Sequence, residues 1–428
     1  MNKGTRPGGV AVEERSGILD RQWFERQDKA DPLAGFRDEF HIPDGTIYLD
    51  GNSLGPMPVG TARRAQDIIE KEWGTDLIKS WNSAGWFDLP VRLGDKLAPL
   101  IGAEQGEVVV TDTTSVNLFK VLSAALAMRP GRTRIILEGS NFPTNNYIAE
   151  GAGRWGNGEI EIVLCEKDEI AAAIDERTVA VCITHVHYKT GHLHDMAAIT
   201  RAAHEKGALA IWDLCHSAGA LPVDLNACGA DFAVGCTYKY LNGGPGSPAF
   251  LFAAARHHDD ACQPLSGWWG HAAPFDFDKR FEPAGDIRRF LTGTQPIISM
   301  ALAEQGLEIA ARADIEQVRT KSLRLTDLFI HLIETHCANH GFHLTSPRNA
   351  ADRGSQVAFE HDEGYKIMRA LIDRGVIGDF RAPDTVRFGF APLYLRYVDV
   401  WDAAEILADI MAKDVRKNPE YGERDAVT

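Results

Sequence analysis

Short apolar runs alternate with longer helical stretches through the middle of the chain, from about residue 107 to residue 260. Seven of these runs are rich in aliphatic and β-branched residues: Glu107–Thr111, Arg134–Leu137, Glu161–Leu164, Val179–Thr184, Ala208–Trp212, Asp231–Val234 and Ala249–Phe252. A strand that is covered on both faces is apolar along its whole length. The pattern therefore predicts an α/β fold with a large domain built on a mostly parallel sheet of the seven-stranded type, covered by helices on both faces.

The C-terminal part of the chain has a different pattern of predicted helices and strands. A long helical stretch from about residue 311 is followed by Gln356–Phe359, a helix near Tyr365–Arg374, Val386–Phe390 and a last helix at Val398–Met411. This alternation predicts a smaller α+β domain. The expected organisation is a mobile tail (1–16), an N-terminal segment packing with the small domain (17–70), a large domain (71–310) and a small C-terminal domain (311–428).

Composition and charge narrow the class of protein. The chain has 428 residues and a formal net charge of -15, from 60 acidic and 45 basic residues, and it contains no Lys/Arg run suited to a polyanion. No apolar run approaches the roughly 18 residues that span a bilayer, and the first residues contain no apolar stretch typical of a secretion signal. The seven cysteines form no C-x-x-C pair. We therefore expect a cytoplasmic protein with reduced thiols that binds neither nucleic acid nor membrane.

The most informative stretch runs from Ala208 to Gly246. Asp213 follows an apolar strand at its carboxyl edge, where open α/β sheets bind ligands. Lys239 comes 26 residues later, before a glycine-rich turn. A lysine and a carboxylate at one sheet edge suit pyridoxal phosphate (PLP), because the lysine forms a Schiff base with the aldehyde and the carboxylate keeps the pyridine nitrogen protonated. From these two residues alone, a helix cap and a solvated loop lysine are equally good interpretations.

Candidate partners for the phosphate and the ring of such a cofactor lie upstream. The run at 107–111 leads into an amphipathic helix with Thr114 or Ser115 as its expected N-cap. Hydroxyls and free N–H groups at a helix start can hold an anion, although simple capping is their commoner use. Phe142 lies in the stretch Glu138–Tyr147, after the predicted strand Arg134–Leu137, and could stack on a pyridine ring or simply pack.

Seven motifs follow one another along the chain: YLDGNSLGP (48–56), TSVNLFK (114–120), NFPTNNY (141–147), WDLCHSAG (212–219), YKYLNGGPG (238–246), SGWWGH (266–271) and RFGFAPLY (387–394). In this order and spacing, from about residue 18 to 412, they resemble kynureninase, a family of PLP-dependent hydrolases of fold type I in the class V aminotransferase group. The resemblance implies that water cleaves L-kynurenine to anthranilate and L-alanine in a cytoplasmic homodimer. It further implies a place in the kynurenine pathway, either in tryptophan catabolism or in NAD biosynthesis, and leaves L-kynurenine and 3-hydroxykynurenine both open as substrates.

The resemblance also assigns roles to single residues. Lys239 would carry the Schiff base, Asp213 would face the pyridine nitrogen, and Tyr238 would donate and accept protons in the later steps. Contacts with the cofactor are implied for Thr114, Ser115, Phe142, Pro143, Thr144, Asn145, Thr184, Asp213, His216, Tyr238, Lys239, Trp268 and Thr294. Trp268 and Thr294 match positions that often reach the cofactor from the partner subunit.

Two residues are candidates for binding the substrate. Arg387 matches the arginine that holds the substrate carboxylate, a role suited to its two-pronged donor geometry. Asn52 is a candidate substrate contact, or else shapes the turn in DGNSLG. Asn145 stands where the family usually has Asp, so an ionic role at that position is in doubt.

Several other interpretations are weighed against this one. His185 and His187 would share a strand face and could chelate a metal, but we expect no metal because the cofactor supplies the chemistry. Another fold type I enzyme of the class V group, such as a cysteine desulfurase or an aminotransferase, would share Lys239 and Asp213. A desulfurase would need a reactive cysteine on a mobile loop, whereas Cys337 lies in a helical stretch.

Some aromatic and thiol side chains admit structural roles. Trp268 and Trp269 could form a wall for the substrate ring or be buried at a dimer interface, and Trp81 is expected to pack at least as readily as to bind substrate. Cys215 and Cys236 are expected to pack rather than act as nucleophiles, because no paired base is in view.

Overall fold

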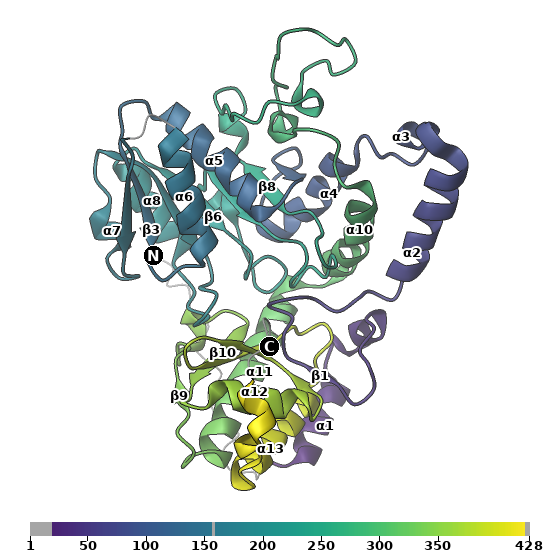
Figure 1. Cartoon of the computed structure of the whole chain (residues 1–428), viewed down its shortest axis with the longest axis vertical. Coiled ribbons are helices and arrows are strands. Elements are labelled where there is room, and N and C mark those ends of the chain that lie inside the picture. The colour runs from purple at the N-terminus through teal and green to yellow at the C-terminus, as the bar shows by residue number, and fades with distance from the viewer. Residues whose placement is uncertain (1–18, 156–158, 424–428) are drawn as a thin grey trace, which may run out of the picture. The chain divides into compact units, whose positions relative to one another are not determined.

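The structure is a computed structural model that describes residues 19–155 and 159–423 (Figure 1). The expected mobile tail at 1–16 lies outside the described residues. The chain divides into two compact units. Unit 1 contains the chain up to Ser53, the short segment Lys189–Leu193 and everything from Ala313 onward, and unit 2 contains Leu54–Tyr188 and His194–Arg312. The division therefore falls after Ser53 and after Arg312, where the sequence had suggested residues 70 and 310.

Unit 2 is built around a sheet that has seven strands among the described residues, in the order β2-β8-β7-β6-β5-β3-β4. The strands are β2 (Val108–Val110), β3 (Arg134–Glu138), β4 (Glu161–Cys165), β5 (Thr178–Thr184), β6 (Leu209–Asp213), β7 (Phe232–Gly235) and β8 (Phe250–Ala253). Each strand lies within one residue of its predicted run. Strands β4, β3, β5, β6 and β7 pair in parallel, whereas β8 is antiparallel to both β7 and β2. The predicted α/β class and the mostly parallel sheet are confirmed.

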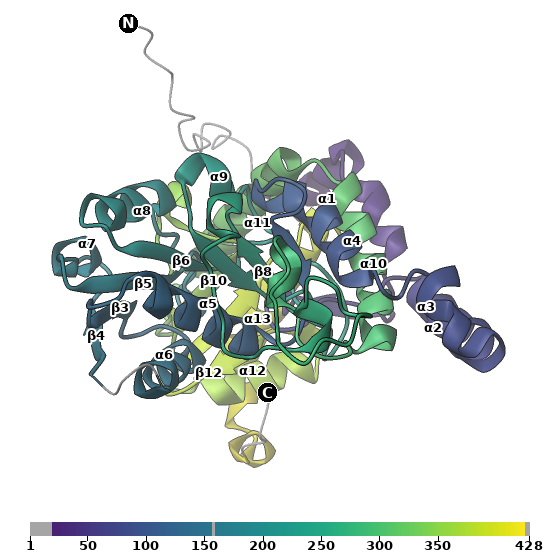
Figure 2. The same ribbon diagram turned by 90° about the horizontal axis from the view of Figure 1, so that it is seen from above.

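Helices cover both faces of this sheet. The helices of unit 2 are α2 (Thr61–Asp67), α3 (Ser80–Ser83), α4 (Leu89–Leu97), α5 (Thr114–Met128), α6 (Pro143–Trp155), α7 (Ile170–Ala173), α8 (Met196–Glu205), α9 (Leu225–Cys228) and α10 (Ile297–Arg312). Of these, α2 and α3 stand away from the sheet (Figure 1). Figure 2 shows α8 and α9 on one side of the sheet and α5 and α6 on the other. The side chains of β2, β3, β5, β6, β7 and β8 are almost all buried between these layers, which explains their apolar runs, whereas β4 at the edge of the sheet is partly exposed.

Unit 1 combines helices with short strands. Its helices are α1 (Arg21–Ala30), α11 (Ile315–His336), α12 (Gly364–Ile372) and α13 (Tyr397–Ala412). Its strands are β1 (Ile47–Tyr48), β9 (His343–Leu344), β10 (Gln356–Glu360), β11 (Val376–Ile377), β12 (Asp379–Arg381) and β13 (Thr385–Gly389). In the described part of the chain, β12-β13-β10-β9 form an antiparallel sheet, and β1 pairs in parallel with β11. The predicted α+β pattern is confirmed, and the N-terminal segment contributes strand β1 to it.

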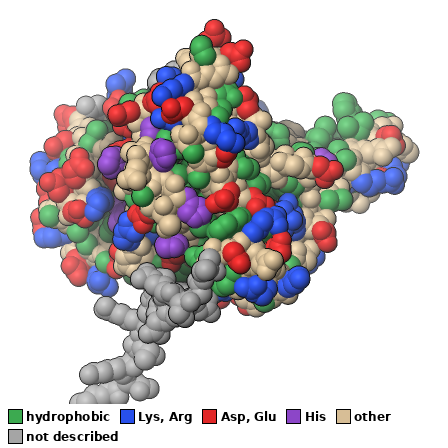
Figure 3. Space-filling model, turned by 90° about the horizontal axis from the view of Figure 1, so that it is seen from below, with side chains coloured by type: hydrophobic (Ala, Val, Ile, Leu, Met, Phe, Trp, Pro, Cys, Tyr) green, Lys and Arg blue, Asp and Glu red, His purple; other side chains and the backbone are tan. Residues whose placement is uncertain are grey.

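Charged side chains of both signs share the surface. On the face shown in Figure 3, acidic and basic side chains are mixed. Within residues 19–155 and 159–423, we find no helix that combines the length and the apolar character needed to cross a bilayer.

A buried carboxylate fixes the relative position of strands β6 and β7. Asp231, just before β7, accepts hydrogen bonds on Oδ2 from His204 Nε2 (2.8 Å) and from the backbone N–H of Ala210 in β6 (2.7 Å). Its Oδ1 accepts from His257 Nε2 (2.7 Å) and Arg256 Nη2 (2.8 Å). Burial opposes ionisation, but the donors around the carboxylate hold the pKa of Asp231 well below its usual range. This network anchors the two strands that lead to Asp213 and Lys239.

We expect Asp231→Asn to lower the free energy of unfolding at pH 7 by about 3 kcal/mol, the lower end of the range for breaking a buried ion pair, since Arg256 keeps access to water. The folded-state pKa of Asp231 is depressed, so its stabilisation is present above the unfolded pKa of about 4 and is lost as the pH falls further. Urea unfolding at several pH values should therefore show that the difference in free energy of unfolding between wild type and variant becomes smaller below about pH 4. Asp168→Asn, an exposed control, should change stability by less than about 0.5 kcal/mol. A gap that does not depend on pH would contradict this account.

Candidate active site

The carboxyl ends of β5 and β6 bring polar side chains together in unit 2. Thr184 and Asp213 are register partners at these strand ends, and both are buried. Asp213 Oδ1 accepts from the backbone N–H of Cys215 at 2.8 Å, and Oδ2 accepts from Asn145 Nδ2 at 2.9 Å. A charged carboxylate inside a protein needs such donors, because burying it without partners is costly. Asp213 is thus held rigidly at the sheet edge that the sequence predicted.

Helix α6 delivers Asn145 to this carboxylate. The helix begins at Pro143, a residue favoured at the first helical position, and it turns Asn145 inward while Pro143 stays exposed. The preceding Asn141 accepts hydrogen bonds on Oδ1 from Thr184 Oγ1 and from the N–H of Phe142. Its Nδ2 is buried and finds no acceptor within the described residues.

The departure at Asn145 has a direct electrostatic consequence. The amide of Asn145 donates to Asp213, which an ionised aspartate at the same position could not do. Two carboxylates in contact would have to share a proton, since like charges at this distance disfavour full ionisation. The neutral amide of Asn145 places no like charge beside the carboxyl group of Asp213.

Lys239 lies in the loop that follows β7. Its Nζ is 2.9 Å from His216 Nε2 and 5.8 Å from the centroid of the Tyr238 ring. The loop is held from outside by Gly55, whose N–H donates to the carbonyl of Tyr238 at 2.7 Å. A Cβ at Gly55 would come within 2.4 Å of the Lys239 carbonyl oxygen, so only glycine permits this approach. Thus the structure brings together Lys239, Tyr238 and His216.

The surroundings of Tyr238 favour its protonated form. Burial raises the pKa of the Tyr238 phenol, and the neighbouring thiols of Cys236 and Cys215 raise it further. Cys236 Sγ lies 3.8 Å from the carbonyl oxygen of Cys215, so the two thiols belong to adjoining loops of the site. A phenol in this environment is better suited to donate a proton than to accept one.

Helix α5 begins one residue earlier than expected. Thr113, not Thr114 or Ser115, is the N-cap, because Thr113 has the extended backbone of a cap and its hydroxyl accepts from the N–H of Val116 at 3.3 Å. Thr114 and Ser115 are consequently the first helical residues, and Thr114 Oγ1 lies 3.8 Å from Cys215 Sγ. This places the helix N-terminus beside the loop after Asp213. The hydroxyls of Thr114 and Ser115 therefore do not cap the helix, and they could bind an anion at its N-terminus.

The turn before α5 is fixed by a buried ion pair. Lys120 Nζ, on the first turns of the helix, lies 2.5 Å from Asp112 Oδ2 and also bonds the carbonyl of Phe290. Asp112 itself has a positive φ of 47°, a strained conformation for a residue other than glycine. The lysine therefore compensates for a bend that aims the helix N-terminus toward the site.

The aromatic candidates lie in different surroundings. Phe142 is 45% exposed and meets Tyr188 edge-on, with ring centroids 5.3 Å apart, so most of one ring face is accessible. Trp268 stacks on the buried Trp269 at 5.3 Å, next to Trp81.

Four further cofactor candidates have no described contact with Lys239. Trp268 is 39% exposed and Thr294 is exposed, and among the described residues neither contacts Lys239. Pro143 is exposed and Thr144 partly buried. Their cofactor contacts stay predictions.

The histidines near β5 are committed to hydrogen bonds within unit 2. His187 Nε2 lies 2.8 Å from the carbonyl oxygen of Ser140, and His194 Nε2 lies 3.0 Å from Glu138 Oε2. Within the described residues, His, Cys, Asp and Glu side chains form no group of three or more suited to a metal.

The two substrate-binding candidates, Arg387 and Asn52, belong to unit 1. Arg387, on β13, stands opposite Asp379 on β12. Its Nε donates to Asp379 Oδ1 at 2.8 Å, and its Nη2 donates to Asp379 Oδ2 and to Ser53 Oγ at 2.9 Å. Asn52 fits best with its amide oxygen toward Arg387 Nε, at 3.0 Å, and its nitrogen toward Asp50 Oδ1, at 3.3 Å. The structure thus brings together Arg387 and Asn52.

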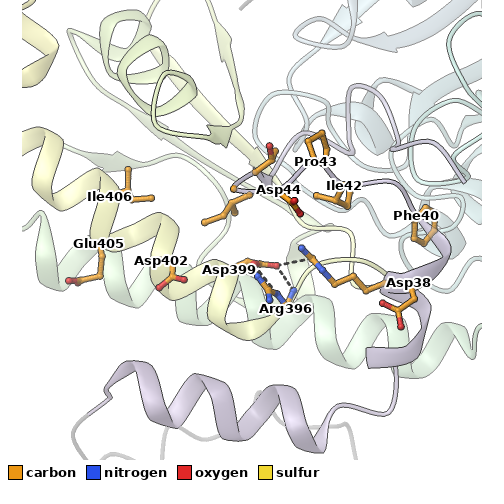
Figure 4. A pocket seen from close by; sticks show the side chains of 14 residues that line it. Asp38, Phe40, Ile42, Pro43, Asp44, Arg396, Asp399, Asp402, Glu405 and Ile406 are labelled. Atoms are coloured by element: carbon orange, nitrogen blue, oxygen red, sulfur yellow. Dashed lines mark hydrogen bonds and ion pairs between the residues drawn. The ribbon is translucent and has the colours of Figure 1, made fainter. Parts of the chain in front are cut away.

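A separate cavity of about 750 Å³ lies in unit 1 (Figure 4). Its walls come from the segment around Phe40–Ile47 and from α13, and Arg37 and Arg396 both point to Asp399 within it. It contains none of the candidate residues described above.

Some functional positions were not singled out from the sequence. Asn141 and Gly55 lie inside two of the motifs but carry no chemical signal of their own. Asp379 could have been found, because a short hairpin between β12 and β13 brings a residue eight positions earlier opposite Arg387.

The residues of unit 2 fit PLP by the chemistry of their donors and acceptors. Asp213 offers a fixed carboxylate to a protonated ring nitrogen, Lys239 offers an amine to an aldehyde, and the start of α5 offers N–H groups and hydroxyls to a phosphate. The buried Nδ2 of Asn141 is a further donor for a polar group of the cofactor.

Comparison with solved structures identifies the fold. A cysteine desulfurase from Thermococcus onnurineus NA1 matches with a TM-score of 0.73 and 17% identity, covering 89% of this chain and 98% of that one. A cysteine desulfurase from Escherichia coli matches with a TM-score of 0.71 and 21% identity, covering 90% and 98%. At these identities the likeness establishes PLP fold type I alone.

Sequence comparison identifies the family. The model of the kynureninase C-terminal domain matches residues 318–407, and that of the DegT/DnrJ/EryC1/StrS aminotransferase family matches residues 89–233. A kynureninase of Burkholderia pseudomallei is 54% identical over 406 residues, and one of Pseudomonas fluorescens is 55% identical over the same length. Each alignment covers 94% of this chain and 98% of the relative. With more than half of its residues identical to these relatives over nearly its full length, the chain belongs to the kynureninase family of PLP-dependent hydrolases.

Proposed function

We propose that this chain uses PLP carried on Lys239 to hydrolyse the Cβ–Cγ bond of L-kynurenine, giving anthranilate and L-alanine. The observation that carries the proposal is the pairing of Lys239 with His216 beside an Asp213 whose two oxygens are both held by donors. A cysteine desulfurase shares the fold, but it would need a reactive cysteine on a mobile loop. Cys337 caps the end of α11 and is buried, so it does not supply one.

The residues of unit 2 hold the cofactor by complementary chemistry. Asp213 would hold a proton at the pyridine nitrogen, the N-terminus of α5 with Thr114 and Ser115 would hold the phosphate, and Phe142 would cover the ring. When bound, PLP would supply an electron-accepting ring that stabilises negative charge on the substrate carbons next to its amine. Asn145 and the N–H of Cys215 keep the carboxyl group of Asp213 in place.

Lys239 and Tyr238 move protons at different stages. Once the substrate amine has displaced it, Lys239 Nζ removes the proton from Cα, and His216 Nε2 holds this amine within 2.9 Å. Tyr238 donates a proton in the later, hydrolytic half, because burial and the two thiols keep its phenol protonated. Arg387 holds the substrate α-carboxylate with its guanidinium, which Asp379 orients.

The active form proposed is a cytoplasmic homodimer. Ile69, Trp73, Leu77 and Ile78 are 49–77% exposed along the segment from η2 (Ile68–Asp76) to η3 (Leu77–Lys79), which Figures 1 and 2 show standing away from the sheet of unit 2. A row of exposed apolar side chains of this kind is typical of a protein interface. The exposed Trp268 and Thr294 suit a contact with the partner's cofactor. All seven cysteines are unpaired in the structure, as is usual in a reducing compartment. We place the reaction in tryptophan breakdown or NAD synthesis.

Purified, PLP-loaded protein incubated with L-kynurenine should produce anthranilate, measured by its fluorescence, together with L-alanine. Lys239→Ala should lose the visible absorption of PLP joined to a lysine and at least ~10²-fold in turnover, because both the attachment point and the base are removed. Lys206→Ala, an exposed lysine paired with Glu176, is the matched control and should behave as wild type. A borohydride-reducible bond between PLP and the Lys239→Ala protein would place the attachment at another lysine.

Tyr238→Phe removes only the hydroxyl, so we expect PLP binding to persist. Exchange of the substrate Cα proton with deuterated solvent should stay fast, while anthranilate release slows by ~10²-fold or more, the usual scale of general acid catalysis. Tyr147→Phe, at a tyrosine that is 67% exposed, serves as the control. If Cα exchange slowed as much as anthranilate release, Tyr238 would belong to the first proton transfer instead.

The dimer is tested by sedimentation of the holoenzyme. We expect a mass of about twice the 47.0 kDa of one chain. Trp73→Glu should shift the protein toward the monomer, because it places a charge in an apolar interface. A monomer in the wild-type protein at micromolar concentration would contradict the proposal.

A further inference from the structure

Two aspartates and two arginines form a cluster around the proposed carboxylate site of unit 1. Asp379 and Arg381 lie on β12, Arg387 lies on β13, and Asp50 follows β1 and pairs with Gly389 at the end of β13. Arg387, Asp379 and Asn52 are buried, and Asp50 is partly buried. The charges of these groups therefore act on one another through a medium that screens them poorly.

Asp379 takes the direct contacts of both guanidinium groups. Besides the two-pronged contact with Arg387, its Oδ2 accepts from Arg381 Nη2 at 2.7 Å and from Ser53 Oγ at 2.8 Å. Burial opposes ionisation of Asp379, but Arg387 and Arg381 lower the pKa of its carboxyl below the usual value. Asp379 is the member of the acidic pair that stays charged.

Asp50 occupies the other position of the pair, linked to Arg387 through the amide of Asn52. Burial raises the pKa of Asp50 to about 7, and the charge of Asp379 adds to this effect. Arg387, a hydrogen bond with the Ser53 side chain and Arg381 oppose this shift without cancelling it. Tyr48 on β1 also faces Asp50, and burial raises the pKa of its phenol, so it stays neutral. Asp50 is therefore the one group of this cluster that changes charge near neutral pH.

The charge of the cluster decides how it receives a carboxylate. With both aspartates ionised, two negative and two positive charges cancel, and a bound substrate carboxylate would leave one uncompensated negative charge. With Asp50 protonated, the cluster carries one positive charge and matches one carboxylate. Like charges in a poorly screened site disfavour each other, so the substrate and an ionised Asp50 compete.

We propose that the carboxyl group of Asp50 is a proton-holding group of the substrate site: it is protonated when the substrate carboxylate is bound at Arg387, and its ionisation at higher pH weakens that binding. This inference rests on the proposed role of Arg387. It makes Asp50 a determinant of substrate affinity as a function of pH, and not a group that touches the reacting carbons.

The pH dependence of KM tests the proposal. Binding is strong while Asp50 is protonated and weakens as the pH rises through about 7, so KM for L-kynurenine should rise between pH 6 and pH 9, at most about tenfold per pH unit. Asp50→Asn cannot ionise and should keep the low-pH KM over the whole range, with the pH profile of kcat unchanged. Titrations of the substrate and of the cofactor affect both proteins equally, so they cancel in the ratio of the wild-type KM to the KM of Asp50→Asn. A ratio that does not change with pH overturns the proposal, and Asp50→Ser makes the same comparison if Asp50→Asn does not fold.

Three companion variants separate the possible outcomes. Asp44→Asn, at an exposed aspartate of the same unit, should keep the wild-type pH profile. Asp379→Asn should raise KM at every pH, because it releases Arg387 from its fixed orientation. Arg387→Ala should raise KM tenfold or more. An unchanged KM in the last variant would remove the proposed carboxylate site itself, which is a different result from parallel pH profiles of wild type and Asp50→Asn.

A direct measurement of protons gives an independent check. We expect the Lys239→Ala protein to bind L-kynurenine while its turnover is at least ~10²-fold slower, so calorimetric titration in two buffers of different ionisation enthalpy can count the protons taken up on binding. At pH 7 we expect about half a proton more for this protein than for the double variant with Asp50→Asn, because about half of the Asp50 groups start ionised. Equal proton uptake by the two proteins would contradict the proposal.

Discussion

The buried carboxylate of Asp213 imposes the main constraint on the large unit. A carboxylate at this depth needs donors, and these come from two different places in the sequence. The backbone of Cys215 supplies one and helix α6 supplies Asn145, while the register of β5 against β6 sets Thr184 next to Asp213. Strand β5 and helix α6 therefore both supply residues to the contacts around Asp213, which fixes where β5 ends and where α6 begins. Lys239 reaches its place because β7 pairs with β6 and because Gly55 leaves room for the following loop.

Unit 1 contains a buried positive charge, which also needs partners. Arg387 is buried, and an unpaired guanidinium there would be costly, so the hairpin of β12 and β13 sets Asp379 directly opposite. Such a pair does little for stability by itself, because desolvation offsets much of its attraction. Its effect is to fix the direction of the guanidinium fork. A ligand carboxylate then meets a group that loses little side-chain entropy on binding.

Backbone architecture was much easier to predict from the sequence than side-chain partners. The seven apolar runs located the seven described strands of the large sheet within one residue. Burial on both faces explains the continuous apolar signal of every one of them except the partly exposed edge strand β4. The start of α5 was misplaced by one residue, because three hydroxyl residues in a row, Thr113 to Ser115, can each cap a helix. Asp379 and Asn141 were missed, because their roles arise from strand register and from a loop whose path no local pattern encodes. The structure joins the N-terminal segment to unit 1 through a two-residue strand, too short for its pairing to be seen in a single sequence.

Two aspartates of this protein lie among different neighbours. Both oxygens of Asp213 accept hydrogen bonds from neutral donors, the amide of Asn145 and the backbone N–H of Cys215. Asp50 lies beside another carboxylate, and the nearest guanidinium groups already contact that neighbour, so burial and like charge raise its pKa to about 7. A carboxylate in place of Asn145 would bring to Asp213 the like charge that Asp50 meets from Asp379. The amide at position 145 instead supplies a donor to Asp213, whereas Asp50 shares its surroundings with a like charge and can therefore hold a proton near neutral pH.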